Sequence, residues 1–226
     1  MGERADKLKH VRLKTPVSED DLKALEIGSV VFLNGMLYTA REGVYEKILN
    51  KGETPEIDFT RLTNVNFHCA PAASTNDDGS YNVGAVTATA SFRFAKYLKR
   101  WFAETGTRVI IGKGGMSQAH YNELFVPAGA VYLTTVGYGT GALLGRGIAG
   151  VEAVNWLDEL GIAQAMWILK LENFGPLLVE SDFAGNSLFE KNNAELASRV
   201  EGLYEGLKPP ALARYGETRD KTEELI

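Results

Sequence analysis

RVIIGKGGMSQAHYNELFVPAGAVYLTTVG, residues 108–137, alternates between short apolar runs and a helical segment. Residues 108–115 form an apolar run that ends in glycines, residues 116–125 predict a helix, and residues 130–137 form a second apolar run. Short continuous apolar runs are typical of strands buried on both faces, and a helix between two such strands is typical of parallel pairing. This stretch therefore predicts an α/β fold with a mixed sheet.

The sequence on either side predicts further elements of both kinds. A helix with a broad apolar face is predicted by residues that recur at helical spacing, namely Phe94, Leu98, Trp101 and Phe102. Additional strands are predicted at residues 64–71, 81–90, 151–156, 165–174 and 177–183. Residues 186–207 predict a closing helix, with inward positions at Leu188, Leu196, Val200 and Leu203.

Two local signals lie near the N-terminus. Ser18 precedes three acidic residues and predicts the N-cap of a helix at residues 18–27. Asn34 and Gly35 stand between the β-rich runs VVFL and MLYTA, and this pair favours the positive φ angles of a type I′ turn. The sequence therefore predicts a β-hairpin centred on Asn34 and Gly35.

Length and composition indicate one large domain. The chain has 226 residues, of which 45% are hydrophobic, and this is ample for a single packed core. We expect an N-terminal extension at residues 1–12, the domain at residues 13–206 and a polar C-terminal tail at residues 207–226. We also expect a cytoplasmic protein, because residues 1–16 carry charge without an apolar segment.

Charge and cysteine content exclude several functions. The net charge of -5 provides no global positive field for nucleic acid or an anionic membrane, so local groups must hold any bound anion. Cys69 is the only cysteine, which excludes an internal disulfide and a multi-thiolate metal site built from this chain alone. No metal ligands are predicted in this chain.

Three cations stand at the ends of apolar segments rather than on helical solvent faces: Arg41, Arg93 and Lys113. Strand ends are where α/β proteins place ligand groups. Gly112 and Gly114 flank Lys113 and free the backbone to approach an anion. Thr89 precedes Arg93 by four residues, so a hydroxyl and a guanidinium can face the same ligand if a helix begins near Thr89; the alternative is that Thr87 and Thr89 are strand residues that alternate with alanine.

GYGTGA at Gly137–Ala142 offers an alternative interpretation. It follows an apolar run, matches the dinucleotide-binding pattern GxGxxA, and has Asp158 and Glu159 about twenty residues further on. This alternative predicts a dinucleotide-binding protein. A phosphate-binding P-loop around Lys113 is excluded, because Thr107 and Gly114 occupy two of its required positions.

In order and spacing, several segments resemble the beta subunit, or C-terminal domain, of class I fumarases and L-tartrate dehydratases. The resemblance extends from about Leu13 to about Glu190 and rests on KTPVSEDDLKALEIGSVVFLNGMLYTAR (14–41), TASFR (89–93), GKGGM (112–116), ELGIAQAMW (159–167) and FGPLLVESDFAGNSLF (174–189). It implies a swivelling β/β/α domain whose active site lies at the junction with an alpha part that carries a [4Fe–4S] cluster.

The resemblance also implies roles for particular residues. Arg41, Arg93 and Lys113 would bind the carboxylates of a small dicarboxylate substrate, and Thr89 would take part in proton transfer. A cluster with an open iron needs three thiolates, so the cluster would belong to an alpha subunit. Fumarate/malate, tartrate or a methylated analogue could be the substrate, and pairing of two heterodimers is left open.

The sequence departs from the family pattern at Glu42, Tyr45 and Ala90, which stand where aspartate, histidine and threonine are usual, and at Thr87-Ala88, which stands where Gly-Pro is usual. These changes leave the cations intact. Tyr45 and Ala90 motivate a second hypothesis, a non-catalytic or regulatory relative that keeps the fold and the alpha-subunit interface. His68, beside Cys69, is interpreted as a strand residue with its hydrogen bonds satisfied rather than as a ligand.

Overall fold

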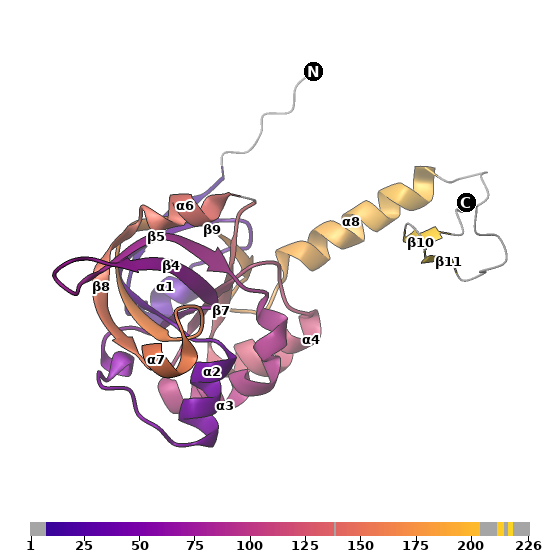
Figure 1. Cartoon of the computed structure of the whole chain (residues 1–226). Coiled ribbons are helices and arrows are strands. Elements are labelled where there is room, and N and C mark those ends of the chain that lie inside the picture. The colour runs from indigo at the N-terminus through magenta and orange to yellow at the C-terminus, as the bar shows by residue number, and fades with distance from the viewer. Residues whose placement is uncertain (1–7, 138, 204–211, 215–216, 219–226) are drawn as a thin grey trace. The chain divides into compact units, whose positions relative to one another are not determined.

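The computed structural model describes residues 8–137, 139–203, 212–214 and 217–218 (Figure 1). Residues 1–189 form one compact unit and residues 190–226 form a second. The predicted tail at residues 207–226 lies largely outside the described residues, which in this region comprise β10 (Leu212–Arg214) and β11 (Glu217–Thr218). These two short strands pair in antiparallel orientation.

The elements of the first unit alternate between strands and helices. Its strands are β1 (His10–Lys14), β2 (Val30–Thr39), β3 (Val65–Phe67), β4 (Cys69–Thr75), β5 (Tyr81–Ala88), β6 (Val109–Gly112), β7 (Val131–Thr135), β8 (Ile148–Asn155) and β9 (Met166–Ser181). Its α-helices are α1 (Glu19–Lys23), α2 (Glu42–Tyr45), α3 (Ala95–Thr105), α4 (Gln118–His120), α5 (Val126–Ala128), α6 (Thr140–Gly145) and α7 (Leu157–Leu160). Short helices of other types are also present. They are the 3-10 helices η2 (Phe59–Arg61) and η3 (Ser91–Phe94) and the π-helices η1 (Glu46–Asn50) and η4 (Tyr121–Phe125).

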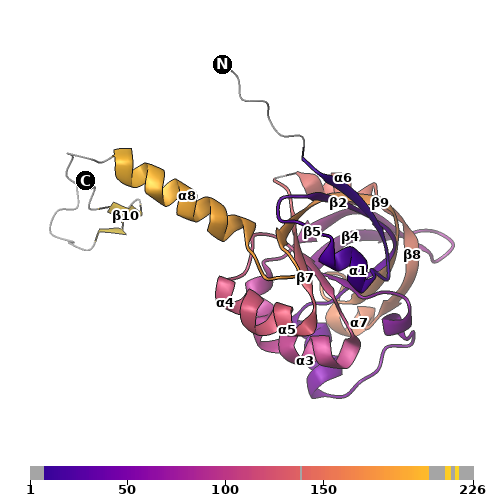
Figure 2. The ribbon, with the colours of Figure 1, turned by 180° about the vertical axis from the view of Figure 1, so that it is seen from behind.

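The main sheet is mixed and closes on itself. Strands β1, β2, β3, β6 and β7 pair in parallel, and β9 pairs antiparallel with β7 and β8. Because β9 also pairs antiparallel with β2, the strands β2, β3, β6, β7 and β9 form a closed ring (Figures 1 and 2). Strands β4 and β5 form a separate hairpin. The predicted α/β fold with a mixed sheet is confirmed.

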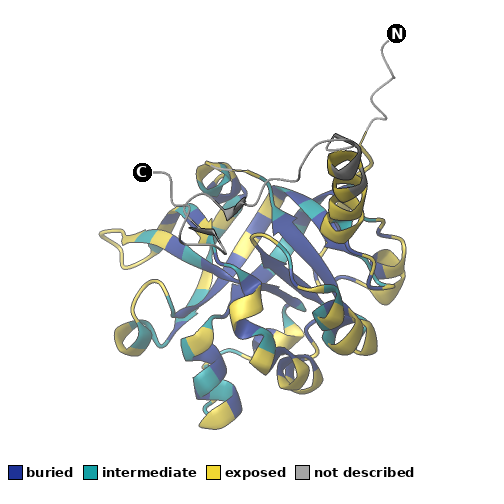
Figure 3. Cartoon of the chain, turned by 90° about the vertical axis from the view of Figure 1, so that its right-hand side faces the viewer, coloured by how far each residue is buried: buried dark blue, intermediate teal, exposed yellow. Residues whose placement is uncertain are grey.

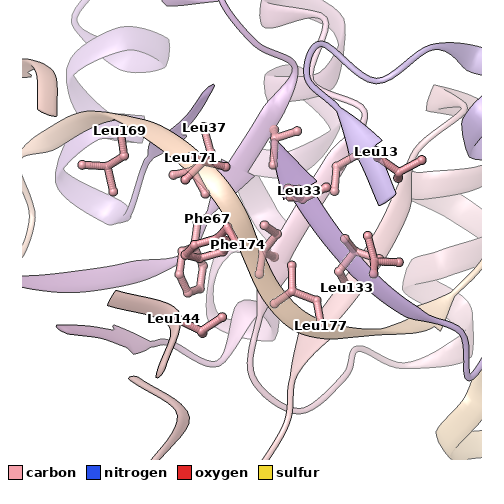
Figure 4. Close-up of a cluster of buried hydrophobic side chains, with 14 of the residues drawn as sticks. Leu13, Leu33, Leu37, Phe67, Leu133, Leu144, Leu169, Leu171, Phe174 and Leu177 are labelled. Carbon is pink, nitrogen blue, oxygen red and sulfur yellow. The ribbon is translucent and has the colours of Figure 1, made fainter. Parts of the chain in front are cut away.

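Two apolar cores lie on opposite faces of this sheet, because successive strand residues point to opposite sides. In β2, Leu37 belongs to the first core and Tyr38 to the second, and Leu133 and Tyr132 alternate in the same way in β7. Figure 4 shows the first core, where leucines of β2, β7 and β9 converge with Phe67. Helices α2 and α3 contribute to the second core and are exposed on their outer sides (Figure 3).

Helix α1 begins where the sequence predicts it. The Ser18 hydroxyl accepts a hydrogen bond from the backbone N–H of Asp21 at 3.1 Å, which satisfies one unpaired donor of the first turn. Leu22 and Leu25 are buried beneath it. The helix ends at Lys23, earlier than predicted.

The predicted hairpin at Asn34 and Gly35 is wrong. Strand β2 runs without reversal from Val30 to Thr39, with register irregularities against β9 on both sides of Leu33. The Met36 N–H, which would close such a turn, instead donates to Thr15 Oγ1 at 2.6 Å, and the Thr15 N–H donates to the Asn34 carbonyl at 2.8 Å. Gly35 has φ 110°, and this angle serves a distorted strand rather than a turn.

Strand β9 is likewise continuous, whereas the sequence predicts two strands at residues 165–174 and 177–183. The predicted closing helix is present as α8 (Leu188–Leu203), but two of its four predicted inward residues are exposed. Leu196 is 55% exposed and Val200 is 47% exposed, so their predicted burial is wrong. Helical periodicity predicts an apolar stripe but does not identify the surface that covers it.

Replacement of Gly35 by alanine should lower the free energy of unfolding by about 2–5 kcal/mol, from backbone strain and overlap together. A Cβ atom at Gly35 would lie 2.5 Å from Thr15 Oγ1 and 2.9 Å from the Thr15 carbonyl oxygen. Gly52→Ala is the matched control, because Gly52 also has a positive φ but has open space around it. Urea unfolding of both variants measures the difference, and equal losses would contradict the close approach of Thr15.

Candidate functional site

Three parallel strands bring separate polar residues to one edge of the sheet. Thr39 of β2 is in register with Phe67 of β3, and Phe67 is in register with Ile111 of β6. Arg41, His68 and Lys113 therefore follow the carboxyl ends of three neighbouring strands. The carboxyl ends of parallel strands are where α/β folds, both open sheets and closed barrels, place ligand sites.

The segment after β5 joins this edge. The Thr89 N–H donates to the His68 carbonyl at 2.6 Å, and the Lys113 N–H donates to the Thr89 carbonyl at 3.2 Å. Ala90 and Lys113 form a parallel bridge. Thr89, which is buried, is thereby held between the ends of β3 and β6, and Arg93 follows it in η3.

Arg41 is half-buried and close to a second cation. Its Nη1 donates to the Ala163 carbonyl at 2.9 Å, while its Nε is buried and makes no hydrogen bond among the described residues. Its pKa is lowered, first by burial and then by the positive charge of Arg93. The two guanidinium groups therefore lie within electrostatic reach of each other, although like charges repel.

No carboxylate within the described part of the chain forms an ion pair with Arg41, Arg93 or Lys113. Arg93 and Lys113 are exposed. Unpaired cations at the end of a sheet, one with a buried donor lacking an acceptor, are suited to binding an anion with more than one acceptor group.

Glycine is required on the two sides of Lys113 for different physical reasons. Gly112 is buried, and a Cβ atom there would overlap Ser91 Oγ and lie 2.5 Å from Tyr132 Oη. Gly114 has φ 67° and open space around it, so it supplies the turn that follows Lys113.

Behind the cations lies a buried chain of polar side chains that the sequence analysis missed, apart from His68. His68 Nε2 lies 2.6 Å from Tyr45 Oη, and His68 Nδ1 lies 2.7 Å from Ser91 Oγ. Tyr132 Oη donates to Ser91 Oγ at 2.9 Å, and Asn66 Nδ2 donates to Tyr45 Oη at 2.8 Å. The interpretation of His68 as a satisfied residue is confirmed. No local sequence pattern identifies the partners of His68, because each of them belongs to a different secondary-structure element.

The buried imidazole makes stability depend on pH. Burial, followed by the positive charge of Arg41, lowers the pKa of His68 to about 3, against 6.5 for an ordinary histidine. Between these values the unfolded chain binds a proton that the folded chain does not, so stability is full above pH 6.5 and falls as the pH drops toward 3. The slope should approach about 1.4 kcal/mol per pH unit.

Urea unfolding of the wild-type chain and of His68→Gln at pH 7 and pH 4.5 tests this pH dependence. The wild-type chain should lose more stability than the variant over this interval. Equal losses would show that His68 does not remain neutral in the fold.

A cavity of about 910 Å³ is lined in part by Lys113. Its walls come from β5, the start of η3, the GKGG loop and residues 135–144: Ala85, Val86, Thr87, Ala88, Ala90, Phe92, Lys113, Gly114, Gly115, Thr135, Gly137, Gly139, Thr140, Gly141, Ala142 and Leu144. Of the predicted site residues, Lys113 and Gly114 line this cavity, whereas Arg41, Thr89, Arg93 and Gly112 do not.

The dinucleotide interpretation of Gly137–Ala142 is wrong. Helix α6, which follows the glycines, has six residues, and a Cβ atom at Gly141 would lie 2.6 Å from the Val86 carbonyl oxygen of β5. Gly141 therefore allows helix and strand to pack closely. Strand β8 pairs antiparallel with β9, not parallel with β7, so the βαβ unit is absent from this described region. Glu159 forms an ion pair with Lys47.

The described residues do not fit an iron–sulfur cluster. Cys69 is buried, and burial raises the pKa of its thiol, which disfavours the thiolate that iron binds. No group of three or more histidine, cysteine, aspartate or glutamate side chains within the described ranges is arranged to hold a metal ion. In the same ranges, every helix is too short or too polar to cross a bilayer.

Comparison with known proteins identifies the family. A family model described as "Fumarase C-terminus" matches residues 1–192. The chain is 34% identical over 188 residues to "Putative L(+)-tartrate dehydratase subunit beta" of Methanocaldococcus jannaschii, covering 83% of this chain and 95% of the relative. It is 27% identical over 201 residues to "L(+)-tartrate dehydratase subunit beta" of Escherichia coli K12, covering 85% and 93%. It is 32% identical over 194 residues to "Putative fumarate hydratase class I" of Geobacillus stearothermophilus, covering 84% of this chain and 36% of that protein. The chain belongs to the fumarase C-terminal family.

Proposed function

We propose that this chain is the beta subunit of an iron–sulfur-dependent hydro-lyase that reversibly hydrates or dehydrates a small C4-type dicarboxylate, such as fumarate/malate, tartrate or a methylated analogue. The supporting observation is the gathering of Arg41, the Thr89–Arg93 segment and Lys113 at one sheet edge without carboxylate partners among the described residues. The names of the relatives support the reaction class.

In this proposal the cations form a carboxylate clamp, defined as Arg41, Arg93 and Lys113. Each guanidinium can donate two parallel hydrogen bonds to a carboxylate, and the buried Nε of Arg41 is available as one such donor. The Lys113 ammonium adds positive charge where an aci-carboxylate develops as the α-proton leaves. Gly114, which has open space around it, lets the backbone approach the substrate beside this ammonium, whereas Gly112 lets Ser91 and Tyr132 pack against the strand that carries Lys113.

Thr89 is proposed to take part in proton transfer. A threonine hydroxyl is a very weak base by itself, so it requires charged neighbours or acts by orienting another group. The Thr89 carbonyl accepts from the Lys113 N–H, and Arg93 follows Thr89 in η3, so both charged residues come from backbone adjacent to it. Thr89→Ser should therefore retain much more turnover than Thr89→Val, which keeps the shape but removes the hydroxyl. Equal activity of the two variants, measured as kcat, would remove this role.

The cluster and an alpha partner complete the proposal. This chain lacks the thiolates for a [4Fe–4S] cluster, so the cluster is assigned to an alpha subunit, where its iron would act as a Lewis acid on the substrate hydroxyl. Two of the relatives are named as beta subunits, which supports such a partner. We propose that the assembly works in the cytoplasm.

Anaerobic reconstitution with the cluster-bearing partner tests the function. The complex should hydrate or dehydrate at least one C4-type dicarboxylate, monitored by absorbance of the conjugated alkene where one forms. A stable complex without turnover on fumarate, malate, tartrate or their methylated analogues would instead favour a regulatory relative. An upstream reading frame with three spaced cysteines would identify the partner.

A further inference from the structure

His68 connects the three segments that carry the clamp. Tyr45 lies one helical turn after Arg41, and the Tyr45 N–H donates to the Arg41 carbonyl at 3.1 Å. Ser91 stands between Thr89 and Arg93. The imidazole of His68 is fully buried and contacts both hydroxyls, so one ring joins the Arg41 segment to the Thr89–Arg93 segment.

The same chain reaches Lys113. Tyr132 Oη donates its one proton to Ser91 Oγ, and the Lys113 N–H donates to the carbonyl of Thr89, two residues before Ser91, at 3.2 Å. At the other end, Asn66 Oδ1 accepts from the Ala40 N–H at 3.0 Å, one residue before Arg41. All three clamp segments are thus attached to one set of buried hydrogen bonds.

A neutral ring meets both hydrogen bonds of His68. Tyr45 Oη accepts from Asn66 and Ser91 Oγ accepts from Tyr132, and each hydroxyl keeps a proton and a lone pair for the ring. Either neutral tautomer forms both bonds, because one ring nitrogen donates and the other accepts. Both arrangements hold the same side chains together, which gives the three segments a defined relative placement.

We propose that His68 is a positioning residue of the dicarboxylate site: its neutral imidazole, through Tyr45 and Ser91, sets the placement of Arg41 and of Thr89–Arg93 relative to Lys113. This inference rests on the proposed function. Groups behind a binding residue that fix its orientation typically change activity by about 10–100-fold when removed. A buried network with a purely structural role would change stability without changing substrate affinity.

A double-mutant cycle in the assembled enzyme tests the proposal. Tyr45→Phe and Ser91→Ala each remove one hydroxyl bound to His68, and each should lower kcat/KM by about 10–100-fold, mainly through a higher KM. Both variants break the same chain of hydrogen bonds. The loss of kcat/KM in the double variant should therefore be only slightly greater than the larger of the two single-variant losses. Combining either variant with His68→Gln should likewise add little.

Tyr38→Phe is the matched control. Tyr38 is fully buried in the same core, and its hydroxyl forms hydrogen bonds with Trp101 Nε1 at 2.9 Å and with Thr107 Oγ1, not with a side chain of the His68 chain. Its removal should lower the melting temperature while leaving KM within about twofold of wild type. If Ser91→Ala does not fold, Tyr132→Phe replaces it, since Tyr132 binds the same Ser91 oxygen.

The outcomes separate the two proposals. If Tyr45→Phe and Ser91→Ala keep wild-type turnover and KM, the role of His68 is overturned and the proposed function stays intact. The same holds if the double variant's loss of kcat/KM is the product of the two single-variant losses. A wild-type complex that neither converts nor binds any C4-type dicarboxylate would overturn both.

Discussion

Lys113→Ala and Arg93→Ala should each lower kcat/KM of the assembled enzyme by about 100-fold or more, without unfolding the chain. Both side chains are exposed and lack ion-pair partners among the described residues, so their removal costs the fold little. In the proposed site each one binds an anionic substrate whose charge increases as the α-proton leaves. Steady-state assays on dicarboxylates, with circular dichroism to verify folding, measure the effect.

Two surface cations provide matched controls for this prediction. Lys170 forms an exposed ion pair with Glu152 on the β8–β9 pair, and Arg61 forms one with Asp58. Alanine at either position should leave kcat/KM within about twofold, because surface ion pairs contribute about 0–1 kcal/mol. Arg93→Lys should give an intermediate loss, since it keeps the charge but not the planar pair of donors. Unchanged turnover in both Lys113→Ala and Arg93→Ala would remove the clamp from the proposal.

Gly112→Ala should damage stability and activity together. The new methyl group would overlap Ser91 Oγ and approach Tyr132 Oη, and the Thr89 carbonyl oxygen lies 3.1 Å away. Overpacking of this kind lowers the free energy of unfolding by about 1–3 kcal/mol. Since Ser91 and Thr89 belong to the segment that carries Arg93, relief of the overlap should also displace the clamp and lower kcat/KM.

Gly84→Ala is the matched control for Gly112→Ala. Gly84 also lies in a strand, β5, and a Cβ atom there meets nothing within 4 Å. This variant should have near wild-type stability and turnover. Urea unfolding and kcat/KM of the two variants give the comparison. A Gly112→Ala chain as stable and as active as Gly84→Ala would contradict the tight packing around Ser91.

The order of strands and helices could be predicted from local sequence, whereas their pairing could not. The apolar runs that end at Gly112 and Thr135 are short and continuous, which predicts buried parallel strands, and the structure confirms them. Asn34 and Gly35 misled the prediction, because turn preference is local and Thr15, which occupies the space beside Gly35, is distant in sequence. Long-range pairing of β2 with β9 overrides the turn signal.

Part of the candidate site was also predictable. Arg41, Arg93 and Lys113 could be recognised as cations at segment ends, and the structure brings their segments to one edge. Their binding roles stay predictions. The His68 chain could not be predicted, since Tyr45, Ser91 and Tyr132 resemble ordinary core or loop residues until the fold places them together.

The pairing of β9 with both β2 and β7 has a consequence for how the chain folds. Partners such as Val31 and Leu177 are separated by most of the domain, and loop-closure entropy opposes such contacts until both segments exist. During synthesis, the edges of β2 and β7 therefore stay without their β9 neighbour until residues 166–181 leave the ribosome. Nascent chains shorter than this expose strand edges that are prone to association with other chains.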